Sequence, residues 1–321
     1  MGLFGKIEMD FPDMENRRLG DEGPFVSVLG FGAWPIGGGL GTVSEEQGIR
    51  AVHTAIDAGI TLIDTAEGYL SSESVLGKSL SLKGSRDKLV IATKLSGEDH
   101  SWAHMSEAID NSLRKLRTDY IDIYQIHSPQ PRWPIEETME GMLRLQEQGK
   151  IRYVGVSNFS PKETAEAMEY GQIVSAQPRY NMVWRETQDV LDFCLEHGLG
   201  VLPHSVLSKG ILGGKYRPGH FFENDDERTR FNFFKGDYFR EVHQAVTKLD
   251  DWAKDHGRDI AQLAIAWILA QPGITSALVG AKSDQQVLQN VKAASWKLTE
   301  EELEEIEMIQ DGFRITWIKA D

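Results

Sequence analysis

Short apolar segments alternate along most of this chain with longer segments of helical spacing. The short segments are rich in β-branched residues, which suits buried strands. Between them, apolar residues recur at intervals of three or four positions, as they do on one face of a helix. The strand candidates, in chain order, are Val28–Phe31, Thr61–Asp64, Leu89–Thr93, Ile121–Ile126, Tyr153–Val156, Ile173–Gln177, Gly200–Pro203 and Ser276–Val279.

The helical segments have recognisable boundaries. Ser44, followed by Glu45, Glu46 and Gln47, predicts the start of a helix that Gly59 ends. Thr299 predicts the cap of a last, acidic helix that runs to Ile309. Further helical segments are Met105–Leu116, Glu136–Glu147, Glu241–Asp255 and Ile260–Ala270.

Eight apolar segments that alternate with helices predict a parallel α/β sheet, and the number eight favours a closed (β/α)8 TIM barrel. A pair of open, doubly wound domains is the structural competitor, but no Pro/Ser-rich stretch or charge run divides the chain. We therefore expect one barrel domain over residues 1–321. We also expect extra helices and a long irregular segment, Gly213–Asp237, after the seventh strand, where long loops are usually functional.

Composition excludes several classes of protein. The 321 residues include 34 Lys and Arg against 49 Asp and Glu, a net charge of −15, which argues against a nucleic-acid surface. The one cysteine, Cys194, leaves no internal disulfide and no cysteine cluster for a metal. No apolar run has membrane-spanning length, and Lys6, Glu8 and Asp10 replace the apolar core of a signal peptide. We expect a cytoplasmic protein without a metal site.

Polar side chains stand at the ends of the predicted strands, from the second strand to the seventh. In a barrel these carboxyl ends meet at one mouth, where active sites form. Any one such residue is more simply a cap, a surface charge or a satisfied core group. That all of them fall at the carboxyl ends of the strands, which meet at one mouth of a barrel, favours an active site there. These residues are Asp64 with Tyr69 soon after it, Lys94, His127, Ser157 with Asn158, Gln177, and His204 with Ser205.

Four of these residues suit proton exchange with a carbonyl or alcohol oxygen. A tyrosine titrates near pH 10, but a neighbouring lysine favours the phenolate and lowers that pKa. A carboxylate beside the lysine keeps it charged, and an imidazole can orient the substrate oxygen through a hydrogen bond. Asp64, Tyr69, Lys94 and His127 supply these parts.

The glycine-rich run that begins at Gly30 invites a dinucleotide-fingerprint interpretation. After Gly30 and Gly32 that fingerprint requires a glycine at position 35, which is Pro35. The run therefore does not predict a Rossmann-type cofactor site.

Taken together, the order and spacing of its motifs show that the chain resembles the aldo-keto reductases, NADP-dependent oxidoreductases built on a (β/α)8 barrel. The resemblance extends from Arg18 to Asn290, nearly the whole chain. The motifs that carry it are Leu62-Ile-Asp-Thr-Ala-Glu-Gly-Tyr69, Ile91-Ala-Thr-Lys94, Asp119-Tyr-Ile-Asp-Ile-Tyr-Gln-Ile-His127, Gly155-Val-Ser-Asn-Phe159 and Gly280-Ala-Lys-Ser-Asp-Gln-Gln-Val-Leu-Gln-Asn290.

The resemblance implies a role for each matching residue. Tyr69 would be the proton donor, Lys94 and Asp64 would tune it, and His127 would orient the substrate carbonyl. Lys282 would meet the 2′-phosphate, so the implied cofactor is NADP(H) rather than NAD(H). The other cofactor contacts implied are Ser157, Asn158 and Gln177 at the nicotinamide carboxamide, Ser205, Leu207, Lys209 and Gly210 along the pyrophosphate, Lys215 and Arg228 as a clasp, and Gly280, Gln286, Gln289 and Asn290 at the adenosine.

Three positions depart from the family pattern. His204 stands where an aromatic ring usually stacks on the nicotinamide, Leu70 replaces a common glycine, and Val279 replaces a proline. An imidazolium facing an oxidised nicotinamide would be repelled. We therefore hypothesise that NADP⁺ binding weakens more than NADPH binding as pH falls through the pKa of His204.

Tryptophans in predicted loops are candidates for the substrate pocket, with Trp34 favoured over Trp102, Trp133 and Trp184. Aromatic walls suit aldehydes, ketones and keto-sugars alike, so the sequence leaves the small-molecule substrate open. It also leaves open whether the protein is a monomer or a homo-oligomer.

The leading hypothesis is an NADP(H)-dependent enzyme that interconverts a carbonyl and an alcohol, with Tyr69 as general acid and base. The alternative on the same fold is a cofactor-binding regulatory subunit with little turnover, as in the potassium-channel β-subunits. A third class, an aldolase or isomerase with Lys94 as Schiff-base amine, is disfavoured because Asp64 beside it would favour the ammonium.

Overall fold

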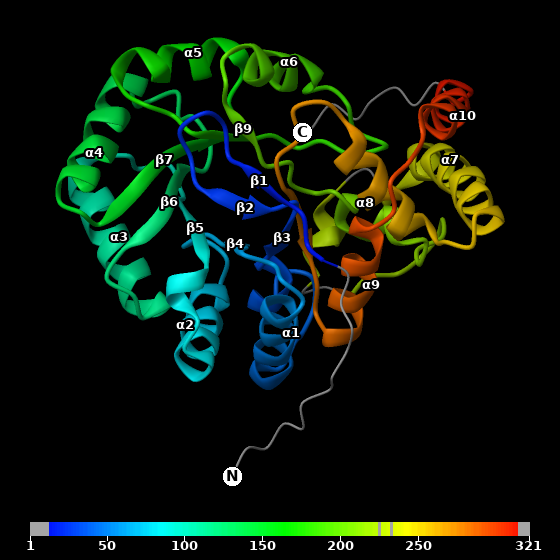
Figure 1. Cartoon of the computed structure of the whole chain (residues 1–321), viewed down its shortest axis with the longest axis horizontal. Helices are drawn as coiled ribbons and strands as arrows, with labels where there is room; N and C mark the ends of the chain where they lie inside the picture. Colours follow the sequence, from blue (N-terminus) through cyan, green and yellow to red (C-terminus); the bar gives the residue numbers. More distant parts are fainter. Residues whose placement is uncertain (1–12, 224–225, 232–233, 314–321) are drawn as a thin grey trace.

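The computed structural model describes residues 13–223, 226–231 and 234–313. The charged N-terminal residues Lys6, Glu8 and Asp10 lie outside this range. Within it, eight parallel strands follow one another around a curled sheet in the order β10-β3-β4-β5-β6-β7-β8-β9 (Figure 1). The strands are β3 (Leu29–Gly32), β4 (Leu62–Asp64), β5 (Val90–Leu95), β6 (Ile121–Ile126), β7 (Ile151–Ser157), β8 (Ser175–Gln177), β9 (Gly200–Val201) and β10 (Ala277–Gly280).

Contacts between β9 and the chain leading into β10 close the sheet into a ring. Val201 forms a parallel bridge with Ile274, and the Val201 carbonyl accepts from the Thr275 N–H at 3.0 Å. The Leu278 N–H donates to the Pro203 carbonyl at 3.1 Å. In the described residues these contacts join the two ends of the eight-stranded sheet, so the predicted (β/α)8 barrel is confirmed.

All eight strands fall on the predicted segments, but several ends differ. β9 stops at Val201 rather than Pro203, because proline has no N–H to donate to a ladder. β5 runs to Leu95 and β7 to Ser157, so Lys94 and Ser157 lie within strands and not after them.

Ten α-helices surround the barrel in the described part of the chain. The Ser44 hydroxyl accepts from the Gln47 N–H, as predicted, and Gly59 at φ 86° follows the end of that helix. The helices are α1 (Glu45–Asp57), α2 (Ser72–Lys83), α3 (Trp102–Leu116), α4 (Ile135–Glu147), α5 (Pro161–Tyr170), α6 (Gln188–Glu196), α7 (Gly236–Asp255), α8 (Ile260–Ala270), α9 (Asp284–Ala294) and α10 (Glu300–Asp311). None of them combines the length and apolar character of a membrane span.

A hairpin that the sequence did not predict covers the amino-terminal end of the barrel. β1 (Asn16–Arg18) and β2 (Phe25–Ser27) pair antiparallel, with three residues each. Leu19 and Val26 pack with buried residues in the barrel strands or directly beside them, namely Leu62, Ala92, Ile123, Val174, Leu202 and Leu278. This plug leaves the opposite mouth for chemistry.

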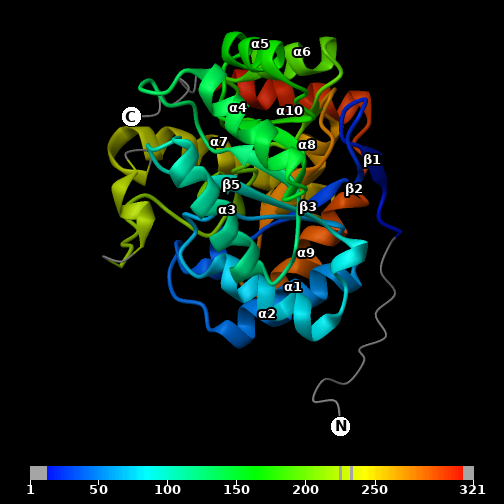
Figure 2. The ribbon, with the colours of Figure 1, turned by 90° about the vertical axis from the view of Figure 1, so that its left-hand side faces the viewer.

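The long segment after the seventh barrel strand lies at that opposite mouth. It includes the short helices η3 (Ser208–Gly213) and η4 (Glu227–Arg230), and the chain between them is irregular where it is described. Figure 2 shows this segment and the hairpin at opposite ends of the barrel. The prediction of a long segment after strand seven is therefore correct.

Candidate active site

A cavity of about 1080 Å³ opens at the carboxyl ends of the strands. Tyr69, Asp64 and His127 line it, whereas Lys94 lies fully buried behind them. Every residue that the sequence predicted as a cofactor contact also lines this cavity, namely Ser157, Asn158, Gln177, His204, Ser205, Leu207, Lys209, Gly210, Lys215, Arg228, Gly280, Lys282, Gln286, Gln289 and Asn290.

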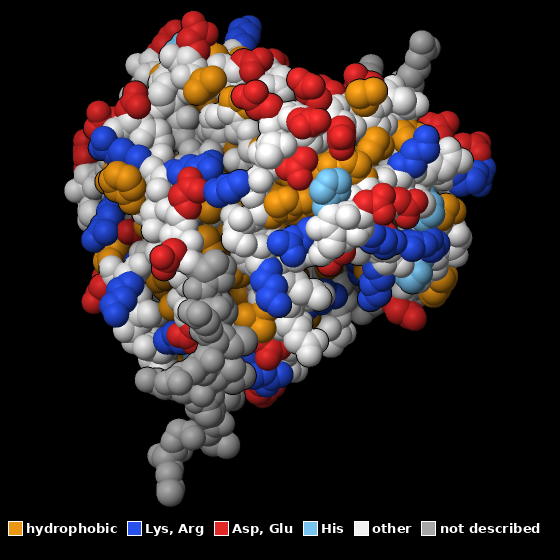
Figure 3. Space-filling view, turned by 45° about the vertical axis from the view of Figure 1, so that its right-hand side comes forward, with side chains coloured by type: hydrophobic (Ala, Val, Ile, Leu, Met, Phe, Trp, Pro, Cys, Tyr) orange, Lys and Arg blue, Asp and Glu red, His pale blue; other side chains and the backbone are white. Residues whose placement is uncertain are grey.

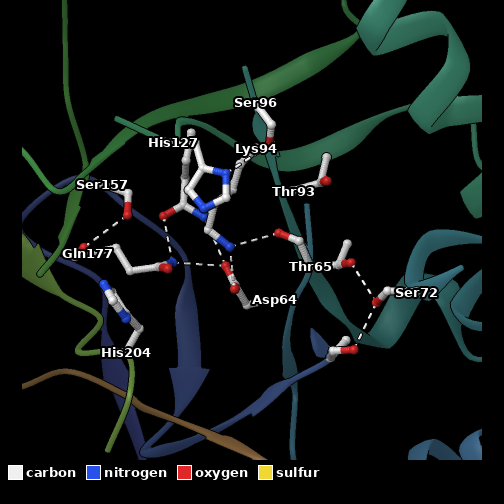
Figure 4. Close-up of polar contacts among 12 residues, drawn as sticks. Asp64, Thr65, Ser72, Thr93, Lys94, Ser96, His127, Ser157, Gln177 and His204 are labelled. Carbon is white, nitrogen blue, oxygen red and sulfur yellow. Dashed lines mark hydrogen bonds and ion pairs between the residues drawn. The ribbon is translucent and has the colours of Figure 1, made fainter. Parts of the chain in front are cut away.

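A buried ion pair forms the base of the site (Figure 4). The Lys94 ammonium lies 2.5 Å from Asp64 Oδ1 and donates to the Thr65 carbonyl at 2.8 Å. Burial alone would lower the pKa of Lys94, but Asp64 and Tyr69 together raise it above its usual value. Lys94 therefore stays an ammonium, which argues against nucleophilic use as a Schiff-base amine.

Two glutamines complete the ion pair, and one of them was not predicted. Gln125 and Gln177 each donate an amide N–H to Asp64 Oδ2 at 2.9 Å, and Gln177 also donates to Gln125 Oε1. Gln125 is fully buried in β6. In β6 it lies on the same inward face as Ile121 and Ile123. A polar residue on this otherwise apolar face is the feature of the sequence from which its place in the site could have been predicted.

Tyr69 sits among aromatic rings and above the lysine. Its ring stacks on Trp34 at 5.6 Å between centroids, and the His127 ring meets it edge-on at 5.7 Å. Lys94 Nζ lies 5.0 Å from the centre of the Tyr69 ring. Desolvation raises the pKa of Tyr69 and outweighs the opposing effect of Lys94. The expected lowering of this pKa is thus wrong for the structure, and the phenol holds its proton at neutral pH.

His127 is neutral for a similar reason. Burial and the charge of Lys94 lower the pKa of His127 to about 3. Its Nδ1 lies 2.8 Å from the Ser96 hydroxyl, which leaves Nε2 as the ring nitrogen for a ligand in the cavity. A neutral imidazole can donate one hydrogen bond without adding a charge.

His204 is held by its neighbours in the cavity wall. Its Nε2 lies 3.1 Å from Asn158 Oδ1, and its Nδ1 lies 3.0 Å from the Ser205 hydroxyl. Burial, reinforced by Arg179, lowers the pKa of His204 well below 6.5. If protonation of His204 affects NADP⁺ binding as hypothesised, the effect therefore belongs below the neutral range. Asn158 and Ser205 both have left-handed backbones, at φ 57° and 58°, which is a strained conformation common at functional sites.

Cations gather at the far end of the cavity. Lys282 Nζ donates to the Leu40 carbonyl, and its backbone N–H donates to Gln286 Oε1 at 2.8 Å. Arg228 pairs with Asp226 and also donates to the Leu40 carbonyl at 3.3 Å. The long segment and the chain around Leu40 thus meet over this end of the cavity.

Lys209 lies nearer the middle of the cavity wall. Its ammonium is 3.8 Å from the centre of the Trp34 ring and 4.2 Å from that of Phe231. Desolvation lowers the pKa of Lys209 to about 8. Leu70, the residue that departs from the common glycine, also lines the cavity and adds apolar bulk beside Tyr69.

Of the predicted pocket tryptophans, Trp34 alone lines the described cavity wall, and the proposals for Trp102 and Trp184 need correction. Trp102 is the first residue of α3, and the Arg144 guanidinium stacks on its ring at 4.0 Å. Trp184 is 5% exposed and packs under Arg179. Trp133, also outside the lining, donates to the Glu98 carbonyl. Packing in a helix accounts for Trp102, and packing in loops accounts for Trp133 and Trp184.

The arrangement defines a class of protein, a (β/α)8 barrel whose carboxyl-terminal mouth holds a tyrosine, a histidine and a buried lysine–aspartate pair, with a long cavity that ends in cations. The model of the Aldo/keto reductase family matches residues 28–311. The chain therefore belongs to the aldo/keto reductase family of oxidoreductases, which interconvert carbonyl and alcohol groups.

Similar proteins agree with this assignment. Aldo-keto reductase YhdN of Bacillus subtilis is 38% identical, covering 93% of this chain and 94% of its own. A probable voltage-gated potassium channel subunit beta of Arabidopsis thaliana is 32% identical, covering 87% and 91%. The solved structure of the glycerol dehydrogenase AKR11B4 from Gluconobacter oxydans has a TM-score of 0.84 at 31% identity and covers 95% of this chain and 98% of that one.

Proposed function

We propose that the protein is an NADP(H)-dependent oxidoreductase that interconverts a small carbonyl compound and its alcohol, with Tyr69 as general acid and base. The observation that carries the proposal is the meeting of Tyr69, His127 and the Lys94–Asp64 pair at one cavity that also holds every predicted cofactor contact. Such a cofactor, when bound, supplies or accepts the hydride.

The chain's own residues handle the proton. In reduction, the Tyr69 hydroxyl donates its proton to the carbonyl oxygen, while His127 Nε2–H holds that oxygen in place. The phenolate left behind is stabilised by the Lys94 ammonium, because Lys94 Nζ lies 5.0 Å from the centre of the Tyr69 ring. Asp64 holds the ammonium in position through its 2.5 Å contact. Oxidation reverses these steps, and the phenolate takes the proton of the alcohol.

Donors along the cavity suit an NADP(H) molecule. Asn158 and Gln177 offer amides near the acid–base centre, and Lys282 and Lys215 offer cations at the other end. A 2′-phosphate carries nearly two negative charges, so a protein with a net charge of −15 needs such a local group of cations to hold it. These features favour NADP(H) over NAD(H).

The test is a tryptophan-fluorescence titration of the full chain with NADPH and then with NADH. Trp34 in the cavity wall gives the reporter. We expect NADPH to bind at least about tenfold more tightly, because a charge-assisted contact contributes about 1.5–3 kcal/mol. Equal affinities for the two cofactors would contradict the NADP(H) assignment, and binding of neither would contradict the function.

A cofactor-binding regulatory subunit is the second candidate, and the similarity to a probable channel β-subunit favours it. Steady-state turnover separates the two. We expect NADPH oxidation with small aldehydes, ketones or keto-sugars, and the similarity to a glycerol dehydrogenase supports adding glycerol and related hydroxy-carbonyl compounds to the screen. NADPH binding without turnover of any of these would favour the regulatory subunit.

A further inference from the structure

Ser96 lies against the ring of His127 at the cavity wall. It follows β5 directly, and the parallel register of β5 with β6 pairs Leu95 with Ile126. The next residues, Ser96 and His127, therefore come to lie side by side, and the His127 N–H donates to the Leu95 carbonyl at 3.1 Å. The Ser96 hydroxyl is 2.8 Å from His127 Nδ1. Figure 4 shows the two side chains facing each other.

Either group can be the donor in this contact, because the tautomer of His127 decides the roles. A serine hydroxyl can rotate its proton onto Nδ1, and among the described residues His127 Nδ1 is the one side-chain or backbone hydrogen-bond partner of this hydroxyl. A neutral imidazole carries its single N–H on the nitrogen that does not accept. With Nδ1 accepting, the ring proton is on Nε2, which is the nitrogen that the substrate oxygen requires as a donor.

A second contact fixes Ser96 itself. Its backbone N–H donates to Glu67 Oε1 at 2.6 Å. Gly68, the next residue, leaves room for the serine, because a Cβ at that position would lie 3.3 Å from both Ser96 Cβ and Oγ. The turn that carries Tyr69 therefore also fixes the position of Ser96, and Ser96 in turn contacts the ring of His127.

We propose that Ser96 is a positioning residue for carbonyl reduction, which donates to Nδ1 of His127 and so keeps the ring in its Nε2–H tautomer. The proposal rests on the proposed function. It predicts a role for a residue that touches neither the Lys94–Asp64 pair nor the cation end of the cavity. Without the Ser96 hydroxyl, part of the protein would hold His127 in the Nδ1–H tautomer, which cannot donate to the substrate oxygen from Nε2. The reaction should then be slower, while cofactor binding should be unchanged.

The kinetic test compares Ser96→Ala and Ser96→Thr with the control Ser81→Ala. Ser81 is an exposed serine of α2 outside the cavity lining, and its hydroxyl donates to the backbone carbonyl of Gly77. We expect Ser96→Ala to lower kcat about five- to tenfold with NADPH affinity unchanged, as for the loss of one hydrogen bond. Ser96→Thr, which keeps the hydroxyl, should retain most of the wild-type kcat, and Ser81→Ala should leave kcat unchanged.

A second measurement needs no turnover. The ¹⁵N spectrum of the full-length protein, with the His127 signal identified through His127→Asn, should show an unprotonated Nδ1 in the wild type and a mixture of tautomers in Ser96→Ala. A protonated Nδ1 in the wild type, or an Ala variant with unchanged tautomer and unchanged kcat, would overturn the proposal. So would an equal loss of kcat in Ser96→Thr, or a loss of NADPH affinity in Ser96→Ala. Because the spectrum is independent of activity, failure of the proposed function would not be mistaken for failure of this one.

Discussion

At the scale of single residues, burial decides the protonation state of each group at the site. Desolvation raises the pKa of Tyr69 and lowers the pKa of His127 to about 3, although both groups lie beside the same lysine. Both are therefore neutral at neutral pH, while Lys94 stays an ammonium, 2.5 Å from Asp64 Oδ1. A neutral donor pair over a buried ammonium suits proton donation to a carbonyl oxygen.

Cofactor choice is a residue-scale property that one substitution tests. We expect Lys282→Gln to weaken NADPH binding about tenfold and to leave NADH binding nearly unchanged, because only NADPH carries the 2′-phosphate. Fluorescence titration measures both affinities. The matched control is Lys292→Gln, an exposed lysine on α9, the helix that follows Lys282. A similar loss of affinity for both cofactors would show that Lys282 attracts either cofactor through its charge and does not recognise the 2′-phosphate.

Which residues line the cavity was largely predictable, but their environments were not. Motif order and strand ends pointed to Asp64, Tyr69, Lys94 and His127, all of which meet in the structure. The direction of the Tyr69 pKa shift depends on how much water reaches the phenol, and a sequence records neighbours along the chain, not burial.

Gln125, Ser96 and the misplaced tryptophans show the same limit. Gln125 and Ser96 gain their roles from partners on other strands, through a register that sequence alone does not fix. Trp102 and Trp184 were grouped with Trp34 as aromatic residues in loops, but Trp102 packs under Arg144, and Trp184 lies behind the cavity-lining Arg179.

At the scale of elements, the short helix η1 (Trp34–Gly37) supports the turn that carries Tyr69. A Cβ added at Gly37 would lie 2.3 Å from the Tyr69 carbonyl oxygen, so one of the two segments would have to move. We expect Gly37→Ala to lower kcat about tenfold or more, because a displacement of the acid by a fraction of an ångström is costly. Steady-state kinetics and a thermal melt check this expectation.

Gly213→Ala is the matched control for Gly37→Ala. Gly213 also lines the cavity, but a Cβ there meets no described atom within 4 Å. We expect nearly wild-type kcat and stability for this variant. Wild-type kcat in Gly37→Ala as well would show that the turn is not held by η1.

The elements themselves were predictable where hydrophobic periodicity was strong. The eight barrel strands and the helix begun by Ser44 follow the pattern, because inward positions must be apolar. The hairpin of β1 and β2 was missed, because three residues are too few to show the alternation of apolar and polar positions that predicts a strand. Its value lies in tertiary packing, where Leu19 and Val26 close the barrel floor.

At the scale of the whole molecule, charge is unevenly spread. On the face in Figure 3, Asp and Glu crowd the upper part, whereas Lys and Arg gather in the middle and on the right. A net charge of −15 thus coexists with basic areas, and the cations that line the cavity are a further local group. Net charge alone therefore does not exclude a phosphorylated cofactor.

Global stability should depend on pH through the buried histidines. The pKa of His127 is about 3 in the folded state, below the value near 6.5 in the unfolded chain, so the unfolded state binds the proton more readily. Stability from this group is present above pH 6.5 and falls as pH drops toward 3, by at most about 1.4 kcal/mol per pH unit.

Urea unfolding at several pH values measures this effect. Carboxylates contribute to acid unfolding as well, so the informative quantity is the difference between the wild type and His127→Asn. We expect the stability of the variant to fall less steeply between about pH 6.5 and pH 4. Parallel curves for the two proteins would contradict a strongly lowered pKa for His127.

The most direct test of the central claim is the Tyr69→Phe variant, studied in a single turnover with saturating NADPH and the best carbonyl substrate from the screen. Phenylalanine keeps the ring between Trp34 and His127 but removes the proton. We predict that NADPH binding persists with unchanged affinity, while the rate of NADPH oxidation falls about a hundredfold or more. NADPH oxidation at the wild-type rate in Tyr69→Phe would contradict the account.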